Sequence, residues 1–381
     1  MCNNPVCNNT ACNNPAAIGT KEALLLFDLH DSHAFNALTT SQHNAALGQE
    51  YLMNDAGNVS PVSAASSHSG TSGSGTTSTT ASLPAQTMVG NANGLRIDLI
   101  WDPSVASAPK GFMQAVIDAA EYYTTLFANK DVVNIEVAYG EIAGTPMAPG
   151  ALGESESYGY LTNYQTVTAA LSHDGFVFSA SNEPTNAQFF VTSAEAKALG
   201  LVDPAANLDG YVGFSNLTGT GYSWNTAANP HGSNTGTGPT QFDLQGVALH
   251  EISEVMGRVG AEGTIINGQP TYTPLDLFNF SSPGVLSLSP NGGYFSVNDG
   301  ATNLGTYDNA AATGGDIADW ASISSPTQSH TIGLPGGIHA YDAYDGFTFP
   351  GYNGDVSQSD VIEDAALGFK LTPAGLLAAL T

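Results

Sequence analysis

One short stretch of the chain brings an imidazole and two carboxylates together at helical spacing. His250 and Glu254 are one helical turn apart, so their side chains lie on one face of a helix, and Glu251 is next to His250. A catalytic zinc ion takes three protein ligands and leaves one position for water, and imidazole nitrogen and carboxylate oxygen both suit it. The spacing predicts that His250 and Glu254 bind a metal ion and that Glu251 serves as the general base for the attacking water.

The element that must position these residues is a helix between Asp243 and Gly260. Asp243 is a favourable N-cap, and Gly260 stands where a left-handed C-cap would end the helix. Apolar residues recur at helical spacing and predict a buried stripe: Ala248, Ile252, Val255, Met256 and Val259. The bare His-Glu-x-x-Glu pattern also fits a surface helix with one histidine and solvated glutamates, and taken alone it favours that interpretation.

The surrounding sequence resembles a known family. HEISEVMGR at 250–258, followed by TPLDLF at 273–278, resembles the signature of a family of secreted bacterial metalloproteases, a branch of the zincins close to the metzincins. The resemblance covers about residues 95–369 and includes IDLIWDPSVASAPKGF, VVNIEVAYGE, GALGESESY, AEAKALGLVDPAANLDGYVGFSN, GGYFSVNDGATNLGTYDN and SDVIEDAALGF. It implies a zincin-like α+β domain, zinc as the cofactor, and a secreted endopeptidase that acts on protein or peptide substrates.

The third metal ligand does not follow the metzincin pattern. Glu254 stands where the second motif histidine would be and Gly260 where the third would be, and no methionine follows Met256 to form a Met-turn. Asp276 in TPLDLF is the first choice, because an aspartate lies at about this distance in Asp-zincin variants and the resemblance includes the segment. The alternatives are His330, His339 and Asp308. Two carboxylates and one imidazole make a harder and weaker site for zinc than the metzincin histidines, so calcium or manganese are also conceivable occupants.

Charge and composition narrow the function classes. Acidic residues number 34 against 7 basic ones, for a formal charge of −27, so nucleic acid and anionic membrane surfaces would be repelled. Only 11% of residues are charged, and 43 are glycine, so solubility depends on uncharged polar residues. This composition is typical of an acidic extracellular bacterial protein, and equally of a surface fibre or an adhesin.

Composition also divides the chain into three regions. Residues 1–57, rich in Asn and Cys, are expected to be an arm, an export segment or a propeptide. Residues 58–93 form a linker rich in Ser, Thr and Gly, and 94–381 the zincin-like domain, divided into 94–260 and 261–381. Cys2, Cys7 and Cys12 are evenly spaced, unlike a zinc knuckle, and their odd number leaves a thiol for cross-linking or lipidation. Self-assembly through this arm is a further expectation.

Export is expected by a route without a cleaved leader. The start of the chain lacks a basic region and a long apolar core, and no run approaches the length of a membrane span. The terminal sequence LTPAGLLAALT could act as an uncleaved type I secretion signal. The predicted location is therefore extracellular or on the cell surface.

Alternation and capping signals predict a strand–helix–strand unit at the start of the domain. The strands are expected at 95–101 and 132–139, with the helix between them capped by Ser107. A zincin holds an extended peptide by backbone pairing to an edge strand, and the 150s segment or 209–215 is expected to do so. Hairpins are expected over 281–307 and a final helix from Asp360.

Two other functions remain open at this stage. The Asp-rich loops at 308–356 could bind structural calcium, although solvated turns explain them as well. The altered ligand set, the low charge content and the Cys-bearing arm also fit a surface or filament subunit that uses a zincin-like fold without catalysis, or a calcium-dependent adhesin.

Overall fold

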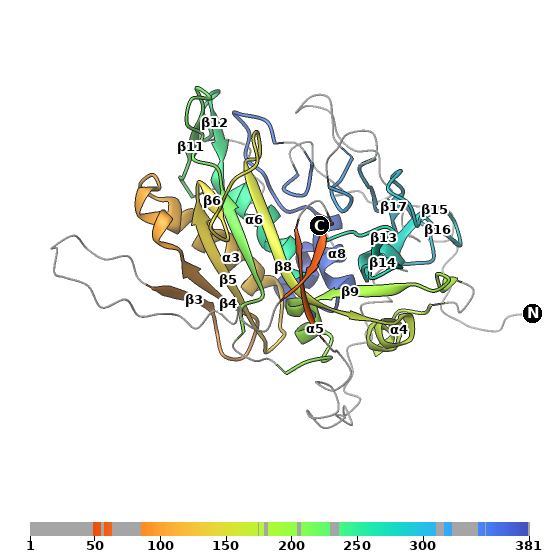
Figure 1. Ribbon diagram of the computed structural model, residues 1–381. Coiled ribbons are helices and arrows are strands. Elements are labelled where there is room, and N and C mark those ends of the chain that lie inside the picture. The colour runs from red at the N-terminus through yellow and green to blue at the C-terminus, as the bar shows by residue number, and fades with distance from the viewer. Residues whose placement is uncertain are drawn as a thin grey trace, which may run out of the picture.

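The computed structural model describes residues 49–54, 57–62, 85–173, 175–178, 182–203, 207–228, 236–309, 316–321, 342–346 and 348–379. These residues form an α+β protein built on one ten-stranded mixed sheet (Figure 1). None of the described helices is long and apolar enough to cross a membrane.

The large sheet has the strand order β13-β14-β9-β8-β10-β5-β4-β3, and β1 and β2 extend it from β8. Its strands, in chain order, are β1 (Glu50–Asn54), β2 (Val59–Pro61), β3 (Gln86–Gly90), β4 (Arg96–Trp101), β5 (Val132–Tyr139), β8 (Gly153–Thr162), β9 (Gln188–Thr192), β10 (Gly210–Phe214), β13 (Thr264–Ile266) and β14 (Gln269–Tyr272). The pairs β4–β5, β5–β10 and β9–β14 are parallel, and the other pairs are antiparallel.

The predicted strand–helix–strand unit is present at the centre of the sheet. The parallel strands β4 and β5 are joined through η1 (Pro103–Ser107) and α3 (Phe112–Leu126), and α3 begins after Gly111, later than the predicted cap at Ser107. In β5, Val133, Ile135 and Val137 are fully buried beneath this helix layer. Helix α6 (Leu244–Met256) packs beside α3 and against β8 and β10, so both helices cover one face of the sheet (Figure 1).

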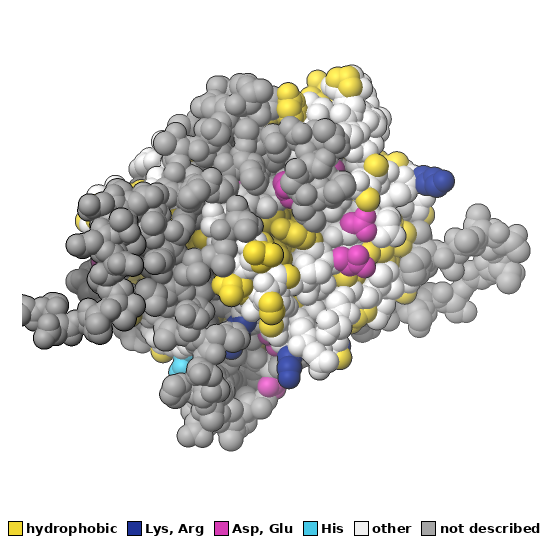
Figure 2. Space-filling model, turned by 180° about the vertical axis from the view of Figure 1, so that it is seen from behind, with side chains coloured by type: hydrophobic (Ala, Val, Ile, Leu, Met, Phe, Trp, Pro, Cys, Tyr) yellow, Lys and Arg dark blue, Asp and Glu magenta, His cyan; other side chains and the backbone are white. Residues whose placement is uncertain are grey.

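Smaller elements surround this core. The remaining helices are α4 (Tyr164–His173), α5 (Ser193–Ala198), η3 (Leu275–Phe278), α8 (Gln358–Ala366) and α9 (Pro373–Ala378). The remaining strands are β6 (Glu141–Ile142), β7 (Thr145–Pro146), β11 (Ser223–Asn225), β12 (Gln241–Asp243), β15 (Asn279–Ser282), β16 (Val285–Leu286), β17 (Tyr294–Phe295) and β18 (Gly305–Thr306). The last four form a separate sheet within the predicted hairpin region. On the face shown in Figure 2, charged side chains are sparse among the described residues.

Parts of the predicted arm and linker belong to the sheet. Strand β1 pairs with β8, from Glu50 opposite Tyr160 to Asn54 opposite Glu156, and β3 pairs with β4 along its whole length. Met53 is only 1% exposed and packs against Phe190. The domain boundary expected near residue 93 is therefore corrected, because β1, β2 and β3 precede it and belong to the large sheet. Their polar, Gly-rich flanks had indicated a linker. Cys2, Cys7 and Cys12 lie outside the described residues.

Candidate metal centre

Helix α6 forms where the sequence predicts it but ends one turn earlier. The Asp243 carboxylate accepts a hydrogen bond from the Gly246 amide at 3.1 Å, as an N-cap does. The helix ends at Met256, and Gly257 takes a φ of 137°, which a residue with a side chain adopts only under strain. Gly257, not the predicted Gly260, is therefore the C-terminal stop, and it turns Arg258 back toward the helix.

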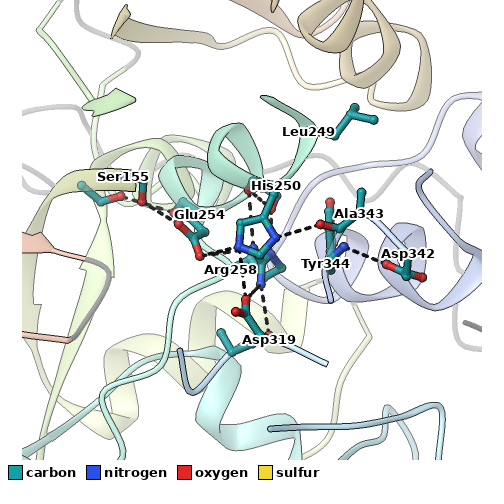
Figure 3. Close-up of polar contacts among 12 residues, drawn as sticks. Ser155, Leu249, His250, Glu254, Arg258, Asp319, Asp342, Ala343 and Tyr344 are labelled. Carbon is teal, nitrogen blue, oxygen red and sulfur yellow. Dashed lines mark hydrogen bonds and ion pairs between the residues drawn. The ribbon is translucent and has the colours of Figure 1, made fainter. Parts of the chain in front are cut away.

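Three side chains meet above this helix. His250 and Glu254 project from α6, and Asp319 arrives from the 316–321 segment (Figure 3). His250 Nε2 lies 3.3 Å from Glu254 Oε1 and 3.3 Å from Asp319 Oδ1. One ligand atom from each residue lies within 4.8 Å of the other two, and this is the one such group of three among the described residues. The group could hold a metal ion.

Two of the three separations match tetrahedral coordination. Zinc–nitrogen and zinc–oxygen bonds are about 2.0–2.2 Å long, so two ligands of a tetrahedral ion lie about 3.4 Å apart. Both separations from the imidazole nitrogen agree with that value. Within the part of the chain that the structure describes, three ligand atoms converge. Three protein ligands would leave a fourth position for water or substrate, as in catalytic rather than structural zinc sites.

Outer contacts fix two of the three ligands in this orientation. His250 Nδ1 lies 2.8 Å from the carbonyl oxygen of Ala343, and because a carbonyl only accepts, Nδ1 carries a proton. This leaves Nε2, which faces the two carboxylates, as the ring atom that a metal ion would bind. Ser155 on β8 donates to Glu254 Oε2 at 2.8 Å, which turns Oε1 toward His250 (Figure 3). Metal-binding histidines and carboxylates are commonly held by partners of this kind.

Arg258 lies behind the carboxylates and is fully buried. Its guanidinium donates to Asp319 Oδ1 at 2.8 Å and to Glu254 Oε1 at 3.2 Å, and its carbon lies 4.5 Å from the ring centre of Tyr344. The arginine therefore connects helix α6 to the segment that carries Asp319.

The surrounding charges set the protonation of the cluster. Burial opposes ionisation of Glu254, but His250, Arg258 and Ser155 outweigh it and lower the pKa of Glu254 to about 2. Burial and Arg258 lower the pKa of His250, but Asp319 and Glu254 raise it by more, so the net shift is upward. The two carboxylates thus attract a cation to the imidazole nitrogen, either a proton or a metal ion.

Glu251 lines the same cleft as the cluster. The cleft holds about 830 Å³, and His250, Glu251 and Asp319 are all on its wall. Glu251 is 5% exposed and lies over Gly153 of β8, where an added Cβ would come within 2.1 Å of its Oε1. The glycine therefore makes room for this carboxylate. Apolar side chains form much of the remaining wall: Ile142, Leu152, Leu217, Tyr222, Phe242 and Val247.

The structure does not bring Asp276 into the group. Its Oδ2 accepts hydrogen bonds from the amides of Thr273 at 2.7 Å, Glu262 at 3.3 Å and Ala261 at 3.5 Å. Asp276 therefore stabilises the loop that follows helix α6 by accepting hydrogen bonds from its backbone. This corrects its expected role as the third ligand. Asp308 is also outside the group, although its amide donates to the Asp319 carbonyl at 2.8 Å. His330 and His339 lie outside the described residues.

Sequence reasoning missed Asp319, although it had noted the acidic segment that contains it. The next residue, Trp320, is fully buried, stacks on Tyr307 at 5.1 Å and donates to Asp360 Oδ1 at 2.7 Å. This anchored tryptophan fixes the position of the aspartate before it. The one local signal is that an aspartate precedes a tryptophan in a loop. That signal does not indicate that Asp319 contacts Glu254, 65 residues earlier, or Arg258, 61 residues earlier.

Comparison with family models, curated proteins and solved structures gives no match to this chain. The candidate metal centre is thus defined by its own geometry: a His–Glu–Asp group, an oriented imidazole, and a neighbouring glutamate in an open cleft.

Proposed function

We propose that this protein is a secreted, metal-dependent peptidase on a zincin-like fold. Zinc is the proposed ion, held by His250, Glu254 and Asp319, and Glu251 is the proposed general base. The observation that carries the proposal is the pair of 3.3 Å separations between His250 Nε2 and the two carboxylates, beside a cleft that also contains Glu251. The HEISEVMGR resemblance supports the same reaction class.

In the proposed reaction, some residues bind the metal ion and Glu251 transfers the proton. Bound zinc supplies a Lewis acid that polarises a carbonyl and lowers the pKa of water to about 7. Glu251 would accept the proton of the attacking water and deliver it to the leaving amine. Ser155 and Ala343 would hold the ligands, and the apolar wall would exclude bulk water from the reacting bond.

Strand β8 is the better candidate for pairing with an extended peptide. Strand β10, the other sequence-based candidate, is hydrogen-bonded to β5 on one edge and to β8 on the other, so it has no edge to offer. The cleft instead follows β8, whose residues from Gly153 to Glu156 are on its wall beside His250 and Glu251. A protein or peptide substrate is therefore proposed to lie along this strand.

Metal analysis and peptide cleavage together test the proposal. The wild-type protein is expected to bind one zinc and to cleave peptides in a tryptic digest of casein, as measured by mass spectrometry. Glu251→Gln should keep the zinc and lose at least about a hundredfold in rate, the lower end of general-base effects. Asp319→Asn should lose zinc, whereas Asp276→Asn should keep it. Zinc retained by Asp319→Asn but lost by Asp276→Asn would reject the ligand assignment.

A second candidate is a non-catalytic surface or filament subunit. The specific observation in its favour is that Arg258 pairs with both Glu254 and Asp319, and His250 lies 3.3 Å from each of them, so that once protonated it completes the charge balance without any ion. A folded protein that binds no zinc, cleaves no casein peptide and assembles into ordered polymers would favour this function. Zinc binding with Glu251-dependent cleavage would exclude it.

A further inference from the structure

The β1–β2 hairpin stands at one end of the cleft. Strand β1 pairs antiparallel with β8 from Glu50 opposite Tyr160 to Asn54 opposite Glu156, and that pairing ends there. The cleft begins where this pairing ends. Asn54 and the β8 residues from Gly153 to Glu156 all line it. The hairpin and the cleft thus follow one edge of one strand, end to end.

That edge is identified by the pairing of β8 with its other neighbours. Strand β10 pairs with β8 from Gly153 to Ser157, and β1 pairs with it from Glu156 to Tyr160. Because the two pairings overlap at Glu156 and Ser157, β10 and β1 must lie on opposite edges. The β8 edge that carries β1 is therefore the edge along which the cleft continues toward Gly153 and Glu251.

The hairpin is an integral part of the core and not a loosely attached segment. Met53 is 1% exposed and packs with Phe190, Val259 and Ala261 on the side of α6. On the opposite face Leu52 packs against a cluster that includes Tyr158. Removing β1 would expose apolar side chains on both faces, so we expect the hairpin to stay in place at this end of the cleft.

We propose that the hairpin limits how far a bound peptide extends toward its amino end. This inference rests on the proposed peptidase function. A peptide paired antiparallel to β8 runs in the same direction as β1, so its amino-terminal side points at Asn54 and meets the hairpin after the stretch opposite Gly153–Ser155. Its carboxyl side runs out past Gly153 toward the open part of the cleft. The substrate class is thus peptides that are bound close to their amino end, narrower than the endopeptidase substrates implied by the resemblance.

The inference is tested by binding, without turnover, on zinc-loaded Glu251→Gln. The probes are pools of degenerate hexapeptides, one without an extension and two that carry a Gly-Ser octapeptide at the amino or the carboxyl end. The amino-terminal extension should lower retention on the immobilised protein at least about tenfold, and the carboxyl-terminal extension should change it less than about twofold. Equal retention of both extended pools, or a loss confined to the carboxyl-terminal extension, overturns the inference.

Failure of the proposed function gives a different result in the same experiment. If no pool is retained better by the zinc-loaded protein than by zinc-free Glu254→Gln, the peptide site itself is rejected.

A second variant examines the hairpin directly. Asn54 is exposed and its side chain accepts from the Asn58 amide, while exposed Asn91 accepts from the Asn93 amide at the far end of the sheet. Asn54→Tyr should lower retention of the unextended pool at least about threefold, whereas the matched Asn91→Tyr should not. Equal retention of the unextended pool by the two variants would show that the hairpin does not limit the peptide site.

Discussion

Arg258 Nη1 lies 2.8 Å from Asp319 Oδ1, the same oxygen that faces His250 Nε2 at 3.3 Å. One carboxylate oxygen therefore serves the arginine and the candidate metal position together. Since Arg258 also contacts Glu254, it holds both proposed carboxylate ligands before any ion binds. Preorganised ligands need less rearrangement when an ion binds, and a buried arginine offsets part of their mutual repulsion.

Replacing Arg258 should destabilise the metal-free protein more than the zinc-bound protein. Arg258→Met leaves two buried carboxylates without their partner and should cost about 3–5 kcal/mol of unfolding free energy in urea. Zinc would restore part of the missing positive charge, so the loss should be smaller in the zinc-saturated variant. Arg96→Met, at a half-buried position on strand β4, is the control and should cost less than about 1 kcal/mol. The same loss with and without zinc would contradict a shared site.

The contact between Ser155 and Glu254 predicts an effect on zinc affinity. Ser155→Ala removes the donor to Glu254 Oε2 and should weaken zinc binding about 10–100-fold in a chelator competition. Ser157 is on the same face of β8 but donates to the backbone carbonyl of Glu254 at 3.3 Å. Ser157→Ala should therefore leave zinc affinity nearly unchanged. Equal losses in the two variants would mean that the carboxylate contact does not orient a ligand.

Gly153 predicts a separation of activity from metal binding. In Gly153→Ala the new methyl would lie 2.1 Å from Glu251 Oε1, so the glutamate must move while His250, Glu254 and Asp319 stay in place. Peptide cleavage should fall at least about tenfold with one zinc still bound. The matched change is Gly94→Ala, where the nearest atom is the Phe127 carbonyl oxygen at 3.5 Å, and full activity is expected. Unchanged cleavage by Gly153→Ala would remove Glu251 from the reaction.

Glu262 predicts how stability depends on pH. Burial and the neighbouring Asp276 raise its pKa from 4.5 to about 9, so between these values the folded state holds a proton that the unfolded state has released. Stability should therefore fall as pH rises through this window, by up to about 1.4 kcal/mol per pH unit from this group.

Glu262→Gln should flatten that dependence. Urea unfolding at pH 5, 6.5 and 8 should show the variant gaining on the wild type as pH increases, because glutamine has no proton to lose. Glu121→Gln, an exposed position on α3, should retain the wild-type slope. Parallel curves for the wild type and Glu262→Gln would show that Glu262 is already ionised in the folded protein.

The sequence alone determined the elements whose signals are local. Asp243 caps α6 as its type predicts, and Ala248, Ile252 and Val255 are fully buried along the expected stripe. Strand β5 has the bounds that its alternating pattern predicts. The pairing of His250 with Glu254 also followed from sequence, because helical spacing alone puts residues four apart on one face.

Tertiary structure decided everything that joins distant segments. Asp276 is near the helix in sequence, but the amides of Ala261, Glu262 and Thr273 capture its carboxylate. Asp319 reaches the site because the burial of Trp320 fixes a loop that has no periodic pattern. Strand β1 joins the sheet by pairing with an edge of β8, and its short sequence does not indicate which strand it would pair with. Local spacing specifies neighbours along one element, whereas long-range packing selects which carboxylate and which strand complete the site.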